Sequence, residues 1–155
     1  MRGPAVPDSR GGMEPISDDT RVNWREILRK LRRLNLPADA YVVVGGAAMS
    51  GRGIRETQDI DLVVTPSLFE HLEQAGWQRK QRPNGKPGLG QGRLEAYLDV
   101  NTETFQRSTS WLLDHADTVD GIPLVDLGTL AGFKASYGRA KDIADLELLE
   151  MYPSK

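Results

Sequence analysis

The chain has 155 residues, with 22 acidic and 20 basic side chains and no cysteine. This length, with 39% hydrophobic and 27% charged residues, predicts a single globular domain that has its own core. The lack of cysteine excludes disulfides, thiolate zinc sites and cysteine nucleophiles, and the net charge of -2 argues against nucleic-acid binding through overall positive charge. No apolar stretch approaches the roughly 18 residues of a transmembrane helix, so we expect no membrane partner and a cytoplasmic location.

The first organised element that the sequence predicts is a helix. Residues 1–20 are rich in proline and lack hydrophobic periodicity, which indicates a disordered tail before a domain that spans residues 21–152. Asn23 is then a suitable N-cap, and apolar residues at helical spacing predict an amphipathic helix over residues 24–34. The other face of this helix is rich in basic residues, which are Arg25, Arg29, Lys30, Arg32 and Arg33 beside a single Glu26. Such a face is typical of a solvated helix, and docking onto RNA or onto an acidic partner is the alternative interpretation.

Strands and helices then alternate along the chain. The β-branched run at residues 41–44 predicts a strand buried on both faces, and Gly45-Gly46 ends it before a short helix at residues 47–50. Further strands are expected at residues 59–64, 77–82 and 93–101, with a helix from residue 66 to about 75 and a glycine-rich loop at residues 83–92. Asp120-Gly121 predicts a hairpin turn, and two helices follow at about residues 127–137 and 139–151.

This alternation predicts an α/β (or α+β) domain with a twisted mixed sheet. We expect the helices to flank one face of the sheet and the carboxylates to lie on the other.

Three aspartates carry the strongest chemical pattern. Asp59 and Asp61 are two residues apart in a predicted strand, so their side chains are expected to project from the same face. Asp99 lies in an otherwise apolar predicted strand, where a carboxylate is costly unless it is paired or binds a metal. Carboxylate oxygens are ligands that Mg²⁺ prefers, and a three-carboxylate cluster with two Mg²⁺ ions is suited to phosphoryl or nucleotidyl transfer. Gly45 and Gly46 allow backbone N–H groups to approach a phosphate.

These residues resemble the DNA polymerase beta superfamily of nucleotidyltransferases. The run Gly-Gly-x-Ala followed by Arg-x-Thr-x-Asp-Ile-Asp-Leu is most similar to the AbiEii-type nucleotidyltransferases of toxin–antitoxin and phage-defence systems. Leu130-x-x-x-Lys134 and Arg139-x-Lys141-Asp142-x-x-Asp145 resemble later motifs of that group. The resemblance covers roughly residues 40–150 and implies the nucleotidyltransferase fold.

The resemblance also implies roles for individual residues. Asp59, Asp61 and Asp99 would be catalytic and bind the two Mg²⁺ ions, and Asp99 is the candidate base toward the acceptor hydroxyl. The implied activity is transfer of an NMP from an NTP, with release of pyrophosphate. The nucleotide would be bound by Gly45, Gly46, Ala47, Ser50, Arg55, Lys134, Asp142 and Asp145.

Two features leave the acceptor and the activity open. Relatives often carry Ser or Thr where this chain has Ala47, so a catalytically decayed antitoxin or binding module is the alternative to an enzyme. The chain is also short, and in size it resembles the small lincosamide nucleotidyltransferases, which favours a small-molecule acceptor as a second possibility. A tRNA or protein acceptor is indicated by the motif spelling and by the predicted basic loop between Arg79 and Arg93, which has five basic residues and no acidic one. A cognate toxin or antitoxin partner follows from the same resemblance.

Overall fold

The first helix of the fold begins where the sequence predicts it, at the start of the part that the structure describes. The computed structural model describes residues 21–152, so the predicted tail at residues 1–20 lies outside the described residues. Helix α1 (Trp24–Leu34) is held by a capping box, in which the Asn23 side chain accepts from the backbone N–H of Glu26 and the Glu26 side chain accepts from that of Asn23. Ile27 and Leu31 of α1 are buried in the core.

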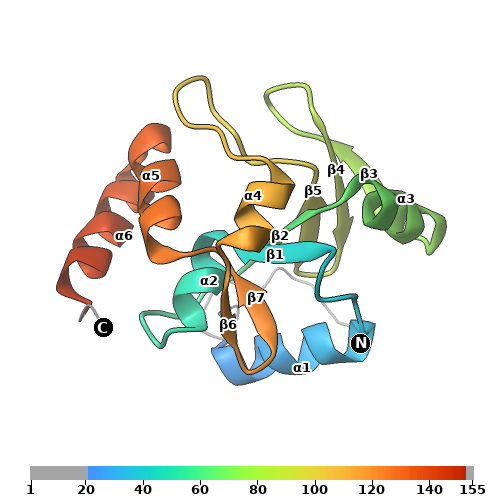
Figure 1. Ribbon diagram of the computed structural model, residues 1–155, viewed down its shortest axis with the longest axis horizontal. Coiled ribbons are helices and arrows are strands. Elements are labelled where there is room, and N and C mark those ends of the chain that lie inside the picture. Colours follow the sequence, from blue (N-terminus) through green and yellow to red (C-terminus); the bar gives the residue numbers. More distant parts are fainter. Residues whose placement is uncertain (1–20, 153–155) are drawn as a thin grey trace, which may run out of the picture.

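A seven-stranded mixed sheet forms the centre of the domain (Figure 1), with the strand order β3-β4-β5-β2-β1-β7-β6. The β1–β7 and β2–β5 pairs are parallel, and the other neighbours are antiparallel. The strands are β1 (Tyr41–Val44), β2 (Ile60–Val64), β3 (Gln78–Gln81), β4 (Pro87–Gln91), β5 (Leu94–Tyr97), β6 (Asp117–Val119) and β7 (Ile122–Leu124).

Both faces of the sheet are covered at its centre. All four residues of β1 are buried, and since alternate residues of a strand point to opposite faces, neither face is open to solvent there. The prediction that this strand is buried on both faces is therefore confirmed. The remaining helices are α2 (Gly45–Ser50), α3 (Pro66–Gln74), α4 (Thr109–Asp114), α5 (Leu127–Tyr137) and α6 (Ala140–Met151).

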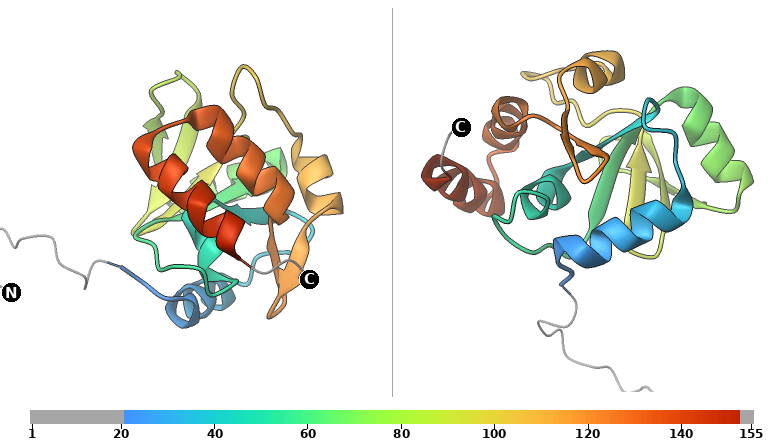
Figure 2. Two further views of the ribbon diagram at one scale, coloured as in Figure 1. Left: turned by 90° about the vertical axis from the view of Figure 1, so that its left-hand side faces the viewer. Right: turned by 60° about the horizontal axis from the view of Figure 1, so that its bottom comes forward.

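Helices α5 and α6 pack against each other at one end of the sheet, on the left of Figure 1. In the left panel of Figure 2 they cross in front of the sheet, beside the loop that joins α2 to β2. The predicted α/β class and mixed sheet are thus confirmed for residues 21–152. Within this part of the chain no helix is long and apolar enough to cross a membrane.

Two segments differ from the prediction. The expected loop at residues 83–92 contains strand β4, which lies between β3 and β5. Gly88 is needed there, because a Cβ at this position would lie 2.9 Å from the ring of Tyr97 on the paired strand. Strand β5 ends at Tyr97, four residues before the predicted end, and helix α4 follows with a Ser108 N-cap that the prediction missed.

Helix α5 is held against the segment before α4 by a close aromatic contact. The ring of Phe105 packs edge-on against Phe133 at a centroid distance of 4.8 Å and lies directly over Gly132. A Cβ at residue 132 would overlap this ring, whereas a Cβ at Gly128 of the same helix would meet only Asp126 Oδ2, at 3.5 Å.

Gly132→Ala should therefore lower the free energy of unfolding by about 1–3 kcal/mol, because the added methyl displaces Phe105. Gly128→Ala is the matched control and should raise it by about 0.5–1 kcal/mol through helix propensity. Urea denaturation measures both. Equal effects of the two substitutions would contradict this packing.

Candidate active site

A cavity of about 430 Å³ opens beside the start of strand β2. Gly45 and Asp61 contribute to its wall from the centre of the sheet, and Tyr97, Phe133 and Tyr137 contribute aromatic rings. Its volume falls in the range of small-molecule sites. Four cationic side chains line the cavity, against the two carboxylates of Asp61 and Asp142; they are Lys80, Arg82, Lys134 and Arg139.

Asp61 is the carboxylate of the sheet that lines this cavity. On one side it pairs with Val44 of the antiparallel β1, and on the other with Glu95 of the parallel β5. Its Oδ1 atom is buried and has no hydrogen-bond partner among the described residues. The other such oxygen belongs to Asp126, whose second oxygen caps α5 by accepting from the N–H of Thr129. Asp61 has no comparable structural task.

The surroundings of Asp61 disfavour its charged form. Burial, followed by the negative charges of Glu95 and Asp59, raises the pKa of Asp61 to about 7. Burial also acts to raise the pKa of Glu95, but hydrogen bonds from Lys80 and Tyr97 outweigh it, so that pKa lies below its usual value. The Lys80 ammonium lies 2.7 Å from Glu95 Oε2. The carboxyl groups of Asp61 and Glu95 are neighbours, and one of the Asp61 oxygens has no partner among the described residues. Such a pair can provide oxygen ligands to a divalent cation.

The Gly45-Gly46 pair gives the chain room to turn beside Asp61. Gly45 has φ +63°, a conformation that side chains disfavour, and a Cβ there would lie 3.3 Å from Asp61 Oδ2. A Cβ on Gly46 would lie 2.5 Å from Thr57 Oγ1 and 2.9 Å from a guanidinium nitrogen of Arg55. Both glycines are thus required for the close approach of the β2 carboxylate and of the loop that precedes it.

A chain of alternating charges joins that loop to α5 and α6. Arg55 donates to both oxygens of Asp145, at 2.7 and 2.9 Å, and Lys134 Nζ lies 2.8 Å from Asp145 Oδ2. Lys134 Nζ is also 3.8 Å from Asp142, which accepts from Arg139 at 2.6 Å. Three cations against two carboxylates leave this chain with one excess positive charge beside Asp61. The structure therefore joins Arg55, Lys134, Asp142 and Asp145 through ion pairs.

Asp59 lies outside the cavity. It is exposed just before β2 and borders a second groove, which it shares with Arg21, Arg55, Lys141 and Asp145. Asp59 is still close enough to raise the pKa of Asp61. Of the two aspartates in the predicted pair, Asp61 thus lines the cavity and Asp59 lines the second groove.

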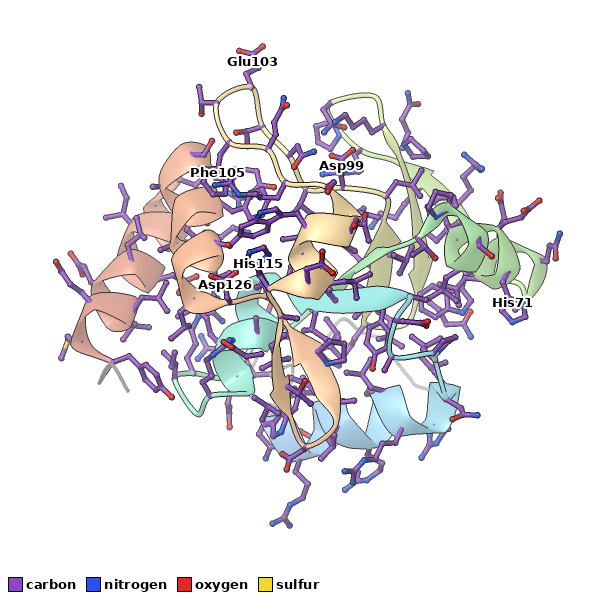
Figure 3. The ribbon with its side chains drawn as sticks, in the orientation of Figure 1. His71, Asp99, Glu103, Phe105, His115 and Asp126 are labelled. Carbon is purple, nitrogen blue, oxygen red and sulfur yellow. The ribbon has the colours of Figure 1, made fainter. Side chains whose placement is uncertain are left out.

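Asp99 does not join these carboxylates. It follows the end of β5, and its Oδ1 accepts from Lys86 Nζ and from the backbone N–H of Asn101, both at 3.0 Å. Figure 3 shows it at the start of the loop above α4. Register explains the error: Glu95 pairs with Asp61, and Asp99 is four residues further on, about 13 Å along an extended chain. Within residues 21–152 no three acidic or histidine side chains are grouped as metal ligands, so the expected Asp59, Asp61 and Asp99 cluster is not assembled.

Ala47 and Ser50 also differ from their expected place. Both are buried on α2, and neither lines the cavity. The Ser50 hydroxyl donates to the carbonyl oxygen of Arg55 at 2.6 Å, which holds the loop that carries this arginine. Their side chains therefore have a structural role on α2 and do not face the cavity.

The predicted basic loop forms a β3–β4 hairpin, and most of its basic side chains are held by ion pairs or hydrogen bonds within the protein. Arg79 pairs with Glu73 of α3, and Lys86 with Asp99. Arg82 donates to the carbonyl oxygen of Asp99 and lies over the ring of Tyr97, 4.5 Å from its centre. Only Lys80 and Arg82 of the five reach the cavity.

Glu95 is the site residue that sequence reasoning missed. The alternation in Leu94-Glu95-Ala96-Tyr97, with Leu94 and Ala96 buried, was available as a pattern and places Glu95 and Tyr97 on the opposite face. The pairing of Glu95 with Asp61, 34 positions away, depends on strand order and is not visible in the sequence. Comparisons of the chain with protein-family models, curated proteins and solved structures gave no match.

The raised pKa of Asp61 predicts a pH-dependent stability in the absence of metal. Between its ordinary value of 3.8 and about 7, the folded protein holds this proton more tightly than the unfolded chain does. Stability is therefore lost as pH rises through this window. Asp61→Asn removes this loss, which amounts to about 1.4 kcal/mol for each unit of the pKa difference, and should raise the free energy of unfolding by about 4 kcal/mol at pH 8.5, with little change at pH 4.

Urea denaturation in EDTA at the two pH values measures this difference. Asp114→Asn, an exposed substitution on α4, is the control and should change stability little at either pH. If Asp61→Asn destabilised the protein equally at both pH values, the buried carboxyl would be stabilising and the description of its surroundings would be wrong.

Proposed function

We propose that this chain is a divalent-metal-dependent nucleotidyltransferase that transfers an NMP from an NTP to an acceptor hydroxyl and releases pyrophosphate. The observation that carries the proposal is the buried, unpartnered oxygen of Asp61, beside Glu95, in a cavity lined by four cations. The resemblance to the DNA polymerase beta superfamily, AbiEii type, supports the same chemistry and makes the nucleotidyltransferase fold part of the proposal.

Asp61 and Glu95 would hold Mg²⁺, and Asp59 would face the acceptor from the groove side. This assignment replaces Asp99 by Glu95, the residue that sheet register places next to Asp61. Bound Mg²⁺ ions neutralise the triphosphate and lower the pKa of the attacking hydroxyl.

The remaining residues bind and orient the donor. The excess positive charge of the Arg55–Asp145–Lys134–Asp142–Arg139 chain faces the triphosphate, while backbone N–H groups at Gly45 and Gly46 approach it closely. The acceptor oxygen attacks the α-phosphorus, a new O–P bond forms, and the bond from that phosphorus to the bridging oxygen breaks. Pyrophosphate leaves with that oxygen, and the acceptor proton passes to a carboxylate oxygen of Asp59, which faces the groove.

The cationic cavity favours an anionic donor and gives no acidic pocket for a cationic antibiotic. A non-catalytic binding module remains the second candidate, favoured by Ala47, which offers no hydroxyl to a phosphate. A cognate toxin or antitoxin is part of the proposal only through the family resemblance.

Substitutions of the paired acids test the site assignment. Glu95→Gln and Asp61→Asn should each reduce NMP transfer by about 100-fold or more, because each removes a carboxylate that would hold Mg²⁺. The matched control Asp99→Asn should retain activity within a few fold. Transfer is measured with each of the four α-labelled NTPs against total RNA and total protein, which identifies donor and acceptor together.

Activity in Glu95→Gln with loss in Asp99→Asn would overturn the register-based assignment. Absence of Mg²⁺-dependent NTP binding by the parent protein at millimolar NTP, measured by calorimetry, would overturn the enzyme proposal. NTP binding without transfer to either acceptor pool would favour the non-catalytic module.

A further inference from the structure

Helix α1 presents a stripe of arginines to solvent. Arg25, Arg29, Arg32 and Arg33 are spaced i, i+4, i+7 and i+8, so they share one face of the helix, and all four are exposed. Arg32 donates to the carbonyl oxygen of Asp120. Within residues 21–152 the other three form no ion pair with an acidic side chain.

The stripe lacks the apolar anchors of a protein interface. The large hydrophobic side chains that are exposed in the described part of the chain lie on α5 and α6, at Tyr137, Ile143, Leu148 and Met151. Protein interfaces have an apolar core from which charged residues are depleted. A row of guanidinium groups without such a core instead fits the regularly spaced phosphates of a nucleic-acid backbone, which arginine binds in bidentate fashion.

This stripe leads directly to the groove that contains Asp59. Val22, just before α1, exchanges backbone hydrogen bonds with Thr57 at 2.7 and 3.2 Å, which ties the start of α1 to the loop before β2. Arg21, four residues before Arg25, lines the groove of about 430 Å³ with Asp59 and Lys141. The left panel of Figure 2 shows the start of α1 (blue) passing below this loop and α6.

We propose that α1 and the Asp59 groove form a binding track for single-stranded RNA. The 3′-terminal nucleotide lies in the groove, with its hydroxyl toward Asp59, and the upstream phosphates follow the arginine stripe, which is about 12 Å long. The placement of the 3′ end rests on the proposed function, whereas RNA binding by the stripe does not. A groove that takes a strand end favours RNA, since cellular DNA is double-stranded. The donor cavity and the acceptor track then reach the reacting phosphate from opposite sides of the Arg55–Asp145 pair.

Binding is measured by fluorescence anisotropy with a labelled ten-nucleotide RNA, in EDTA and without NTP, so that catalysis plays no part. Arg25→Gln/Arg29→Gln should weaken binding about tenfold or more and reduce the salt slope by about 1.4, the value for two phosphate contacts on a single strand. The matched control Arg79→Gln/Lys86→Gln removes the same charge from the β3–β4 hairpin and should change affinity less than about twofold.

The RNA proposal is overturned if the helix variant binds as tightly as the parent, or if the hairpin variant loses as much affinity as the helix variant. It is also overturned if a polyglutamate peptide of the same charge binds as tightly as the RNA, which would indicate an acidic protein partner. RNA binding by a protein that transfers no NMP would leave the track intact and overturn only the proposed enzyme.

Photocrosslinking tests the direction of the strand. A 4-thiouridine at the 3′ end should crosslink to the peptide that contains residues 55–59 or to that around Lys141. A crosslink from this position to the β3–β4 hairpin would overturn the placement of the 3′ end.

Discussion

The close approach of Asp61 to Glu95 across the parallel β2–β5 pair is the constraint on which the arrangement of the site depends. Two carboxyl groups on neighbouring strands repel each other, and burial adds to this cost. This unfavourable pair lies where Gly45 places no side chain against Asp61 and where the cavity beside it is lined by cations. A shared cation would convert this unfavourable pair into a binding site, which is why we connect the pair with function.

The chain of charges from Arg55 to Arg139 makes such a site possible in a small domain. Buried charges are costly unless they are paired, and here the buried Asp145 pairs with the buried Lys134 and with Arg55, while the buried Asp142 pairs with the exposed Arg139. The pairing fixes α5 and α6 against the loop before β2 and still leaves one positive charge in excess. The same aspartates that stabilise the helices therefore orient the cations that would face a triphosphate in the proposed enzyme.

Elements that depend on local sequence pattern were predicted correctly, whereas contacts between strands that are distant in the sequence were not. Helix α1 and strand β1 were predicted at their observed bounds, because Asn23 caps the helix and the β-branched run is short and continuous. The apolar Leu98 and Val100 suggested that β5 continues through Asp99, and Gly88 and Gly90 suggested a loop where β4 forms. Glu95 was missed because its partner is fixed by strand order. The nucleotidyltransferase family remains a prediction, supported by the Gly45-Gly46 and Asp59-x-Asp61 motifs.

Crystals grown with Mn²⁺ and a non-hydrolysable NTP test the central claim most directly, since anomalous scattering locates the metal without assumptions about its ligands. The account predicts an anomalous peak within ligand distance of Asp61 and Glu95, with the triphosphate between Gly45 and Lys134. A peak at Asp99 instead, or a cavity in which neither metal nor nucleotide binds, would contradict it.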